Sequence, residues 1–168
     1  RRRLRINGKT AMEIPRQVEI VEVAPRDGLQ NLSAEVPTGE KIDLVNTIAR
    51  AGLARIEVTT FAHPKWVPQL RDAEEVLAGI ERSGGSRIMV LLPNLRGYER
   101  ARRCLGQFDE VSVVVTATET MNRKNVNASI ADSMKEFGEI VRQAKGNGLR
   151  VRGSIGVAFV CPYEGQTP

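Results

Sequence analysis

The sequence has few of the residues on which metal, disulfide and nucleophile chemistry usually depend. Its 168 residues include one histidine, His63, and two cysteines, Cys104 and Cys161. The cysteines form neither a CxxC pair nor a zinc-ligand pattern, so we expect reduced thiols. A single histidine cannot supply a metal site with two histidine ligands from this sequence alone, and it leaves Cys161 without an obvious partner base.

Long apolar runs are also absent. No stretch of about 18 apolar residues occurs, and no charged, apolar and small-residue signal pattern opens the sequence. We therefore expect a soluble protein without membrane partners, located in the cytoplasm, with the mitochondrial matrix as the alternative.

The positive charge is concentrated at one end. Of the formal net charge of +5, a cluster comprising Arg1, Arg2, Arg3 and Arg5 supplies four charges, so the remainder is nearly neutral and no nucleic-acid partner is expected. The cluster can be a solvated tail, an anion-binding arm or a remnant of an organelle-targeting segment. We favour the first reading and treat residues 1–17 as a basic tail.

The rest of the sequence alternates between two patterns. Five β-branched segments are typical of strands, at residues 18–23, 55–60, 87–92, 110–117 and 150–157. Four segments have helical spacing, at residues 38–51, 72–82, 95–105 and 130–145, with Thr38, Asp72, Asn94 and Ser129 as expected caps. This alternation predicts a parallel sheet with crossover helices.

Two folds fit such a sheet. A doubly wound fold favours a glycine-rich phosphate turn after the first strand, but residues 24–28 contain neither GxGxxG nor GxxxxGK[ST]. A TIM (β/α)8 barrel places polar side chains at the carboxyl ends of its strands; here Arg26 and Asp27 follow the first strand, Asn94 follows the third, and Glu57 lies within the second. We predict the barrel. Since eight strands usually need about 250 residues, residues 18–168 are expected to be the N-terminal part of its catalytic domain.

Arg26 and Asp27 could form an electrophilic site at the end of the first strand. The arginine can present a fixed positive charge to an anionic oxygen, and the aspartate can offer a hard oxygen ligand to a divalent cation. Glu57, on the next strand, could hold the arginine in place through a charge-assisted hydrogen bond. An ordinary ion pair at the mouth of the barrel explains the spacing equally well.

Further polar residues lie between the fourth strand and its helix. Lys124, Asn125, Asn127 and Ser129 could meet a phosphate or a carbonyl, or could serve turns and helix caps. Both readings remain open. For His63 and Trp66 we expect packing roles, in a loop and as an apolar anchor respectively.

Three segments resemble the 3-hydroxy-3-methylglutaryl-CoA lyase family. They are Ala-Pro-Arg-Asp-Gly-Leu-Gln-Asn at 24–31, Phe-Ala-His-Pro-Lys-Trp-Val-Pro-Gln at 61–69 and Cys-Pro-Tyr-Glu-Gly at 161–165, and they occur in the order of that family. Arg-Asp-Gly alone would indicate only the wider group of metal-dependent lyases, aldolases and condensing enzymes. The resemblance extends over residues 18–168.

The resemblance implies roles for particular residues. Arg26 would polarise substrate oxygens with support from Glu57, and Asp27 would bind Mg²⁺ or Mn²⁺. Substrate contacts would come from Arg26, Gln30, Lys124 and Asn125. The paired metal histidines and the catalytic cysteine of the family are absent from this sequence, so we expect it to be incomplete for catalysis by itself.

The implied reaction is the cleavage of 3-hydroxy-3-methylglutaryl-CoA to acetyl-CoA and acetoacetate, in leucine breakdown and ketone-body formation. The expected partners are this substrate and further copies of the chain in a homo-oligomer. Two alternatives remain: a related metal-dependent condensing enzyme or aldolase, and a non-catalytic anion-binding or assembly module that uses the cluster Arg1 to Arg5.

Overall fold

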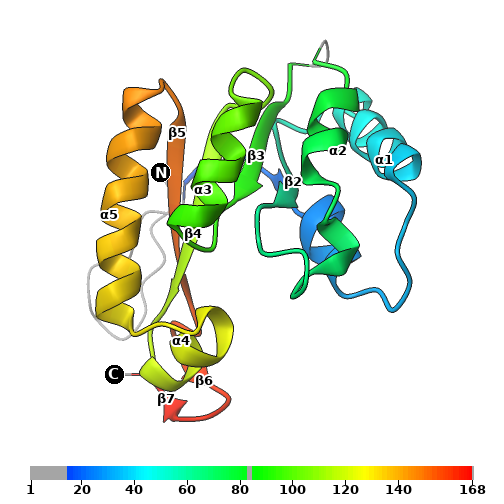
Figure 1. Ribbon diagram of the computed structural model, residues 1–168. Helices are drawn as coiled ribbons and strands as arrows, with labels where there is room; N and C mark the ends of the chain where they lie inside the picture. Colours follow the sequence, from blue (N-terminus) through cyan, green and yellow to red (C-terminus); the bar gives the residue numbers. More distant parts are fainter. Residues whose placement is uncertain (1–14, 83–84, 168) are drawn as a thin grey trace.

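The sheet consists of five parallel strands that follow one another in chain order. Figure 1 shows a computed structural model, which describes residues 15–82 and 85–167. The strands are β1 (Val21–Glu22), β2 (Arg55–Thr60), β3 (Arg87–Leu91), β4 (Glu110–Thr116) and β5 (Arg150–Gly156). Every neighbouring pair is parallel, in the order β1-β2-β3-β4-β5. The sheet curls into a half-barrel, in agreement with the predicted barrel fold.

Helices connect the strands and cover one face of the sheet. They are α1 (Thr38–Arg50), α2 (Ala73–Gly79), α3 (Leu95–Ala101), α4 (Glu119–Val126) and α5 (Ile130–Gly146). Short irregular turns occur at Ala24–Gly28, Pro68–Leu70 and Arg102–Cys104, and a hairpin is formed by β6 (Val160–Cys161) and β7 (Gly165–Gln166). The hairpin and α4 lie together near the end of β4 (Figure 1). Neither had been predicted from the sequence.

The core lies between the sheet and its helices. Alternate strand residues such as Ile56, Ile88 and Val111 are 0–2% exposed and pack against Val45 of α1 and Ile140 of α5. Because successive strand side chains point to opposite faces, one β-branched series per strand is enough to build this layer. Full burial of each such side chain contributes about 1.5–3 kcal/mol.

The opposite face of the sheet is polar. Arg55 and Glu57 of β2 alternate with the core residue Ile56, and Arg87 of β3 aligns with Arg55. At the amino-terminal end of the strands, Glu110 is 3% exposed and pairs with Arg55, while Arg87 lies 3.7 Å from its second oxygen. Glu19 lies 3.3 Å from Arg55 and 3.7 Å from Arg87, so two carboxylates balance the two guanidinium groups at this end of the sheet.

Three of the predicted elements were clearly too long. One is the helix predicted at 95–105, which ends at Ala101 and is followed by a short turn at Arg102–Cys104. The strand predicted at 18–23 is ordered as a strand only at Val21–Glu22, because β2 begins at Arg55, the partner of Val21, and offers no backbone partner further back. Val18 and Ile20 are accordingly exposed. The helix predicted at 72–82 ends at Gly79, after which the chain turns extended at Ile80.

The helix caps are partly as expected. The Asn94 side chain accepts a hydrogen bond from the Gly97 N–H at 2.9 Å, and the Ser129 hydroxyl accepts one from the Asp132 N–H at 3.0 Å. Asp72 is the N-cap residue of α2 as expected, but its side chain makes no capping hydrogen bond, and the cap expected from Thr38 is wrong because Pro37 holds that position. The side chains of Thr38 and Asp72 bond to each other at 2.6 Å, since the start of α1 packs beside the start of α2.

Most of the predicted basic tail, residues 1–14, lies outside the described residues. The division of the chain into a tail, 1–17, and part of a catalytic domain, 18–168, therefore stays a prediction. Within the described ranges, no helix combines the length and apolar character required to cross a bilayer.

Candidate functional site

The turn Ala24–Gly28 places Arg26 and Asp27 at the carboxyl end of β1. The backbone N–H groups of both residues donate to the carbonyl oxygen of Val23, at 3.1 and 2.7 Å, and Pro25 is buried beneath the turn. This winding directs two consecutive charged residues to the edge of the sheet where barrel enzymes carry their active sites.

Arg26 is held between two carboxylates. Its Nε and Nη2 atoms each lie 2.5 Å from Oε1 of Glu57, and its Nη1 lies 2.7 Å from Oδ1 of Asp27. Glu57 is 2% exposed, whereas the side chains of Arg26 and Asp27 are 16% and 54% exposed. A buried carboxylate that binds two guanidinium nitrogens fixes the plane of the arginine. The sequence-based expectation of a contact between Glu57 and Arg26 is thus met.

Asp27 suits one position in a metal shell. Its carboxylate is open to solvent and supplies the hard oxygen that Mg²⁺ or Mn²⁺ prefers. Among residues 15–82 and 85–167, no three His, Cys, Asp or Glu side chains gather as a possible metal site. Asp27 therefore offers the kind of oxygen donor that a divalent cation binds, but the described residues do not complete a coordination shell around it.

The other predicted substrate contacts lie apart from this group. Gln30 is half-buried in the helical turn that continues from Gly28, while Lys124 and Asn125 are exposed on α4. Within the described part of the chain, no hydrogen bond or ion pair joins these three residues to Arg26, Asp27 or Glu57. Lys124 and Asn125 lie in α4, a helix that was not predicted between the fourth strand and the helix at 130–145. The capping reading holds for Asn127, which ends α4 in a left-handed conformation, and for Ser129.

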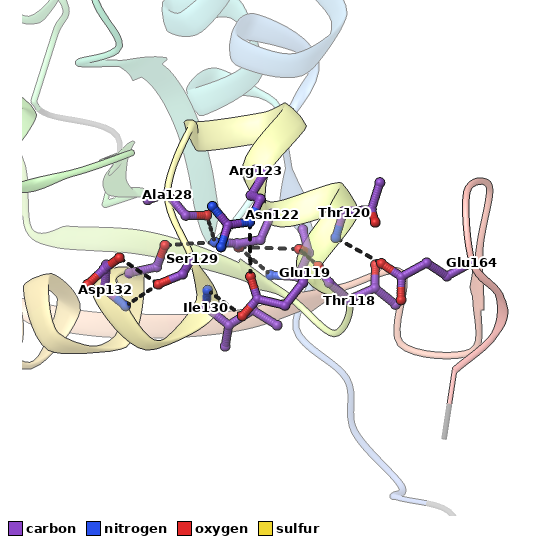
Figure 2. A network of polar contacts seen from close by, with 12 residues as sticks. Thr118, Glu119, Thr120, Asn122, Arg123, Ala128, Ser129, Ile130, Asp132 and Glu164 are labelled. Carbon is purple, nitrogen blue, oxygen red and sulfur yellow. Dashed lines mark hydrogen bonds and ion pairs between the residues drawn. The ribbon is translucent and has the colours of Figure 1, made fainter.

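A buried amide anchors α4. Figure 2 shows Asn122, which is 0% exposed, at the centre of a polar network. Its Oδ1 accepts hydrogen bonds from the backbone N–H and the hydroxyl of Thr116, both at 3.2 Å. Its Nδ2 donates to the Ala128 carbonyl at 3.0 Å and to Ser133 Oγ at 2.8 Å. One side chain therefore ties the end of β4 to α4 and to the first turn of α5.

The hairpin is attached to the same helix. Glu164 Oε1 accepts a hydrogen bond from the Thr120 N–H at 2.8 Å (Figure 2), and the Thr118 hydroxyl donates to Sγ of Cys161 at 3.0 Å. Burial pushes the pKa of the Cys161 thiol upward, but the hydrogen bonds from Thr118 and from the backbone N–H groups of Tyr163 and Glu164 leave this pKa lowered. Cys161 is 2% exposed and, like Cys104, unpaired with another cysteine, as expected.

The loop after β2 contains the only histidine. His63 Nδ1 accepts a hydrogen bond from the Lys65 N–H at 3.2 Å, and its carbonyl accepts one from the Trp66 N–H at 2.8 Å. His63 thus lies in a loop as expected, but its side chain is exposed, so the expected packing role is wrong. The packing role expected for Trp66 is wrong, because the residue is 77% exposed, with the Lys65 ammonium 5.6 Å from its ring centroid.

Arg152 was not identified from the sequence as a charged residue of the polar face. Arg152 alternates along β5 with Val151, which packs on the core, so Arg152 belongs to the same polar face as Glu57. No ion pair involves it within the described residues. The alternation Arg-Val-Arg at 150–152 was the signal that could have identified it.

A cleft of about 420 Å³ lies at the opposite edge of the sheet, where Phe108, Asp109 and Arg150 mark the amino-terminal ends of β4 and β5. In a barrel this edge serves stability, so the group around Arg26 is the better candidate site.

Comparisons with known proteins point the same way. The chain is 45% identical over 153 residues to the mitochondrial hydroxymethylglutaryl-CoA lyase of Rattus norvegicus, covering 91% of this chain and 46% of the relative. It is 46% identical to the cytoplasmic 3-hydroxy-3-methylglutaryl-CoA lyase of Danio rerio, covering 92% and 45%. The chain thus spans about half the length of these relatives.

A solved structure agrees in fold. An HMG-CoA lyase from Acinetobacter baumannii, in complex with coenzyme A and 3-methylmalate, superposes with a TM-score of 0.84 at 40% identity, covering 89% of this chain and 48% of that one. The family described as HMGL-like matches residues 17–168. With its half-barrel, its Arg26 group and this match over nine-tenths of its length, the chain belongs to the HMGL-like family.

Proposed function

We propose that the protein containing this chain, at the length of its relatives, cleaves 3-hydroxy-3-methylglutaryl-CoA to acetyl-CoA and acetoacetate. The observation that carries the proposal is the Arg26 guanidinium, held by the buried Glu57 beside the exposed Asp27. A fixed planar cation next to a hard oxygen ligand suits a reaction in which negative charge develops on substrate oxygens. The names of the relatives support the choice of substrate.

In this reaction the tertiary hydroxyl loses its proton, the neighbouring carbon–carbon bond breaks, and the enolate of acetyl-CoA takes up a proton. Arg26 donates hydrogen bonds to the oxygen on which the enolate charge develops, and Glu57 keeps the guanidinium in the required plane. Asp27 would hold Mg²⁺ or Mn²⁺, which supplies Lewis-acid polarisation of substrate oxygens when bound.

Three residues would contact the substrate away from the reacting carbon: Gln30, Lys124 and Asn125. Lys124 is a solvent-exposed ammonium and suits an anionic part of the thioester, such as a phosphate. The complex of the Acinetobacter relative with coenzyme A supports a coenzyme A thioester as the substrate class.

Two broader features belong to the same proposal. The protein would assemble as a homo-oligomer. Its location would be cytoplasmic, with the mitochondrial matrix as the alternative, since relatives carry either designation.

The decisive experiment is an assay of the protein extended to the length of its relatives, with 3-hydroxy-3-methylglutaryl-CoA and Mg²⁺ or Mn²⁺. Acetyl-CoA and acetoacetate should form in equal amounts, and the 168-residue chain alone should form neither. Net condensation of an acyl-CoA with a keto acid, without cleavage of the lyase substrate, would instead indicate the related condensing enzyme. Polyanion binding without either reaction would indicate the non-catalytic module.

A further inference from the structure

An exposed cation on α4 faces an aromatic ring of the hairpin. The Lys124 ammonium lies 4.7 Å from the ring centroid of Tyr163, within the range of a cation–π contact. The two residues are 39 positions apart, and Tyr163 is 54% exposed. A lysine side chain on a helix surface normally samples many rotamers, so this contact restricts where the charge lies.

The backbone around Tyr163 is held on both sides of the residue. The preceding Cys161 is buried and accepts the hydrogen bond from Thr118, and the following Glu164 accepts the hydrogen bond from the Thr120 N–H. The strands of the hairpin pair through Val160 with Gln166 and through Cys161 with Gly165. Tyr163 therefore stands at the tip of a short hairpin whose first arm, through Cys161, and whose turn, through Glu164, are attached to the amino-terminal part of α4.

The helix that carries Lys124 is equally well fixed. Asn122, two residues earlier, is fully buried and uses both atoms of its amide (Figure 2). Glu119 accepts a hydrogen bond from the Ile130 N–H at 3.1 Å, which closes the turn between α4 and α5. The backbone segments that carry Lys124 and Tyr163 are therefore both held, and the contact between the two side chains sets where the ammonium lies.

We propose that Tyr163 is a positioning residue that holds the Lys124 ammonium ready for an anionic group of a coenzyme A thioester. This inference rests on the proposed function, because it takes Lys124 to be a substrate contact. Tyr163 does not touch the reacting atoms: its effect passes through the lysine. A preorganised cation loses less side-chain entropy on binding, so removal of the ring weakens binding and leaves the chemical step unchanged.

The test compares four variants of the protein extended to the length of its relatives: Tyr163→Leu, Tyr163→Phe, Lys124→Met and the double variant Tyr163→Leu with Lys124→Met. Calorimetric titration with coenzyme A gives Kd, and the lyase assay gives kcat. Tyr163→Leu should raise Kd about two- to fivefold, in line with an exposed cation–π contact, and leave kcat unchanged. Tyr163→Phe keeps the ring and should match the parent, and Tyr163→Leu should add nothing in the Lys124→Met background.

A second readout does not depend on activity. After reductive ¹³C-methylation, the Lys124 methyl resonance, assigned with Lys124→Arg, should be shifted by the ring current of Tyr163. The shift should vanish in Tyr163→Leu and persist in Tyr163→Phe.

The outcomes separate the two proposals. Absence of lyase turnover in the parent would overturn the proposed function, while coenzyme A affinity and the methyl shift would still decide the role of Tyr163. The positioning role is overturned by a missing ring-current shift in the parent, by an unchanged Kd in Tyr163→Leu, or by an equal effect of Tyr163→Leu with and without Lys124.

Discussion

Glu57 Oε1 accepts a hydrogen bond from Nε of Arg26 at 2.5 Å and forms an ion pair with Nη2 of the same arginine, also at 2.5 Å. The carboxylate is 2% exposed and therefore has little freedom to follow a different cation. Two donors on one rigid plane define both the position and the orientation of the arginine. The third nitrogen, Nη1, is directed to Asp27, so the arginine and the candidate metal ligand are mutually oriented.

Arg26→Lys should lower turnover of the full-length protein about 10²- to 10³-fold, because an ammonium cannot satisfy Glu57 and a substrate oxygen in one plane. Steady-state assays of acetyl-CoA formation measure the effect. Arg142→Lys is a matched control, since Arg142 is an exposed arginine of α5 whose ion-pair partner among the described residues is Glu139. A decrease below about threefold in Arg26→Lys would remove the guanidinium from the mechanism.

Asp27→Ala should raise the Mg²⁺ or Mn²⁺ concentration required for half-maximal activity, because a hard cation loses one of its few charged oxygen ligands. Activity of the full-length protein is titrated against each metal. Asp43→Ala removes an exposed aspartate of α1 as a control. If both variants show the same half-saturation as the parent, Asp27 serves only as an ion-pair partner of Arg26.

Asp72 links stability to pH. Burial acts to raise the pKa of this carboxyl, but the hydrogen bonds from Lys41 and Thr38 and the charge of Lys41 leave its pKa below the usual value near 3.8. A pKa that is lower in the folded state contributes stability above the unfolded value, and this contribution is lost as pH falls through the folded value. The stability due to Asp72 should therefore be complete at neutral pH and should decline as the pH falls below about 4.

The corresponding variant is Asp72→Asn. At pH 7 it should destabilise the fold by roughly 2 kcal/mol, because Lys41, only 4% exposed, loses a charged hydrogen-bond partner. Urea unfolding from pH 7 to pH 2.5 should show the difference from the parent shrinking at the acid end. A difference that stays constant over this range would mean that the charge of Asp72 does not stabilise the fold.

Much of the sheet was predictable because its signals are local. In β2, β3 and β4, alternating β-branched residues mark the buried face, and Asn94 and Ser129 cap the helices that follow β3 and α4. The length of β1, by contrast, could not be predicted from the local sequence. It depends on where β2 begins, and only the folded sheet determines that.

The missed helix α4 has a physical explanation. Its one fully buried residue is Asn122, so the apolar spacing that normally reveals an amphipathic helix is absent from Glu119–Val126. The contact of Lys124 with Tyr163 was equally hidden, since residues 39 positions apart meet only through the hairpin. The pairing of Arg26 with Glu57, by contrast, could be predicted, because Arg26 follows the first strand and Glu57 lies in the neighbouring second strand.

Gly97 and Gly138 are both helical glycines, yet their replacement by alanine should have opposite effects. A Cβ at Gly97 would lie 2.9 Å from the Phe61 carbonyl oxygen and 3.1 Å from Cδ of Pro93, while none of the atoms around Gly138 would lie within 4 Å. Because the first obstacle is backbone at the end of β2, α3 cannot keep its place, and Gly97→Ala should destabilise the fold by about 1–3 kcal/mol. Gly138→Ala should stabilise it by up to about 1 kcal/mol, since alanine favours the helix. Urea unfolding of both variants measures the difference, and equal stabilisation by the two would show that α3 does not rest directly on the chain after β2.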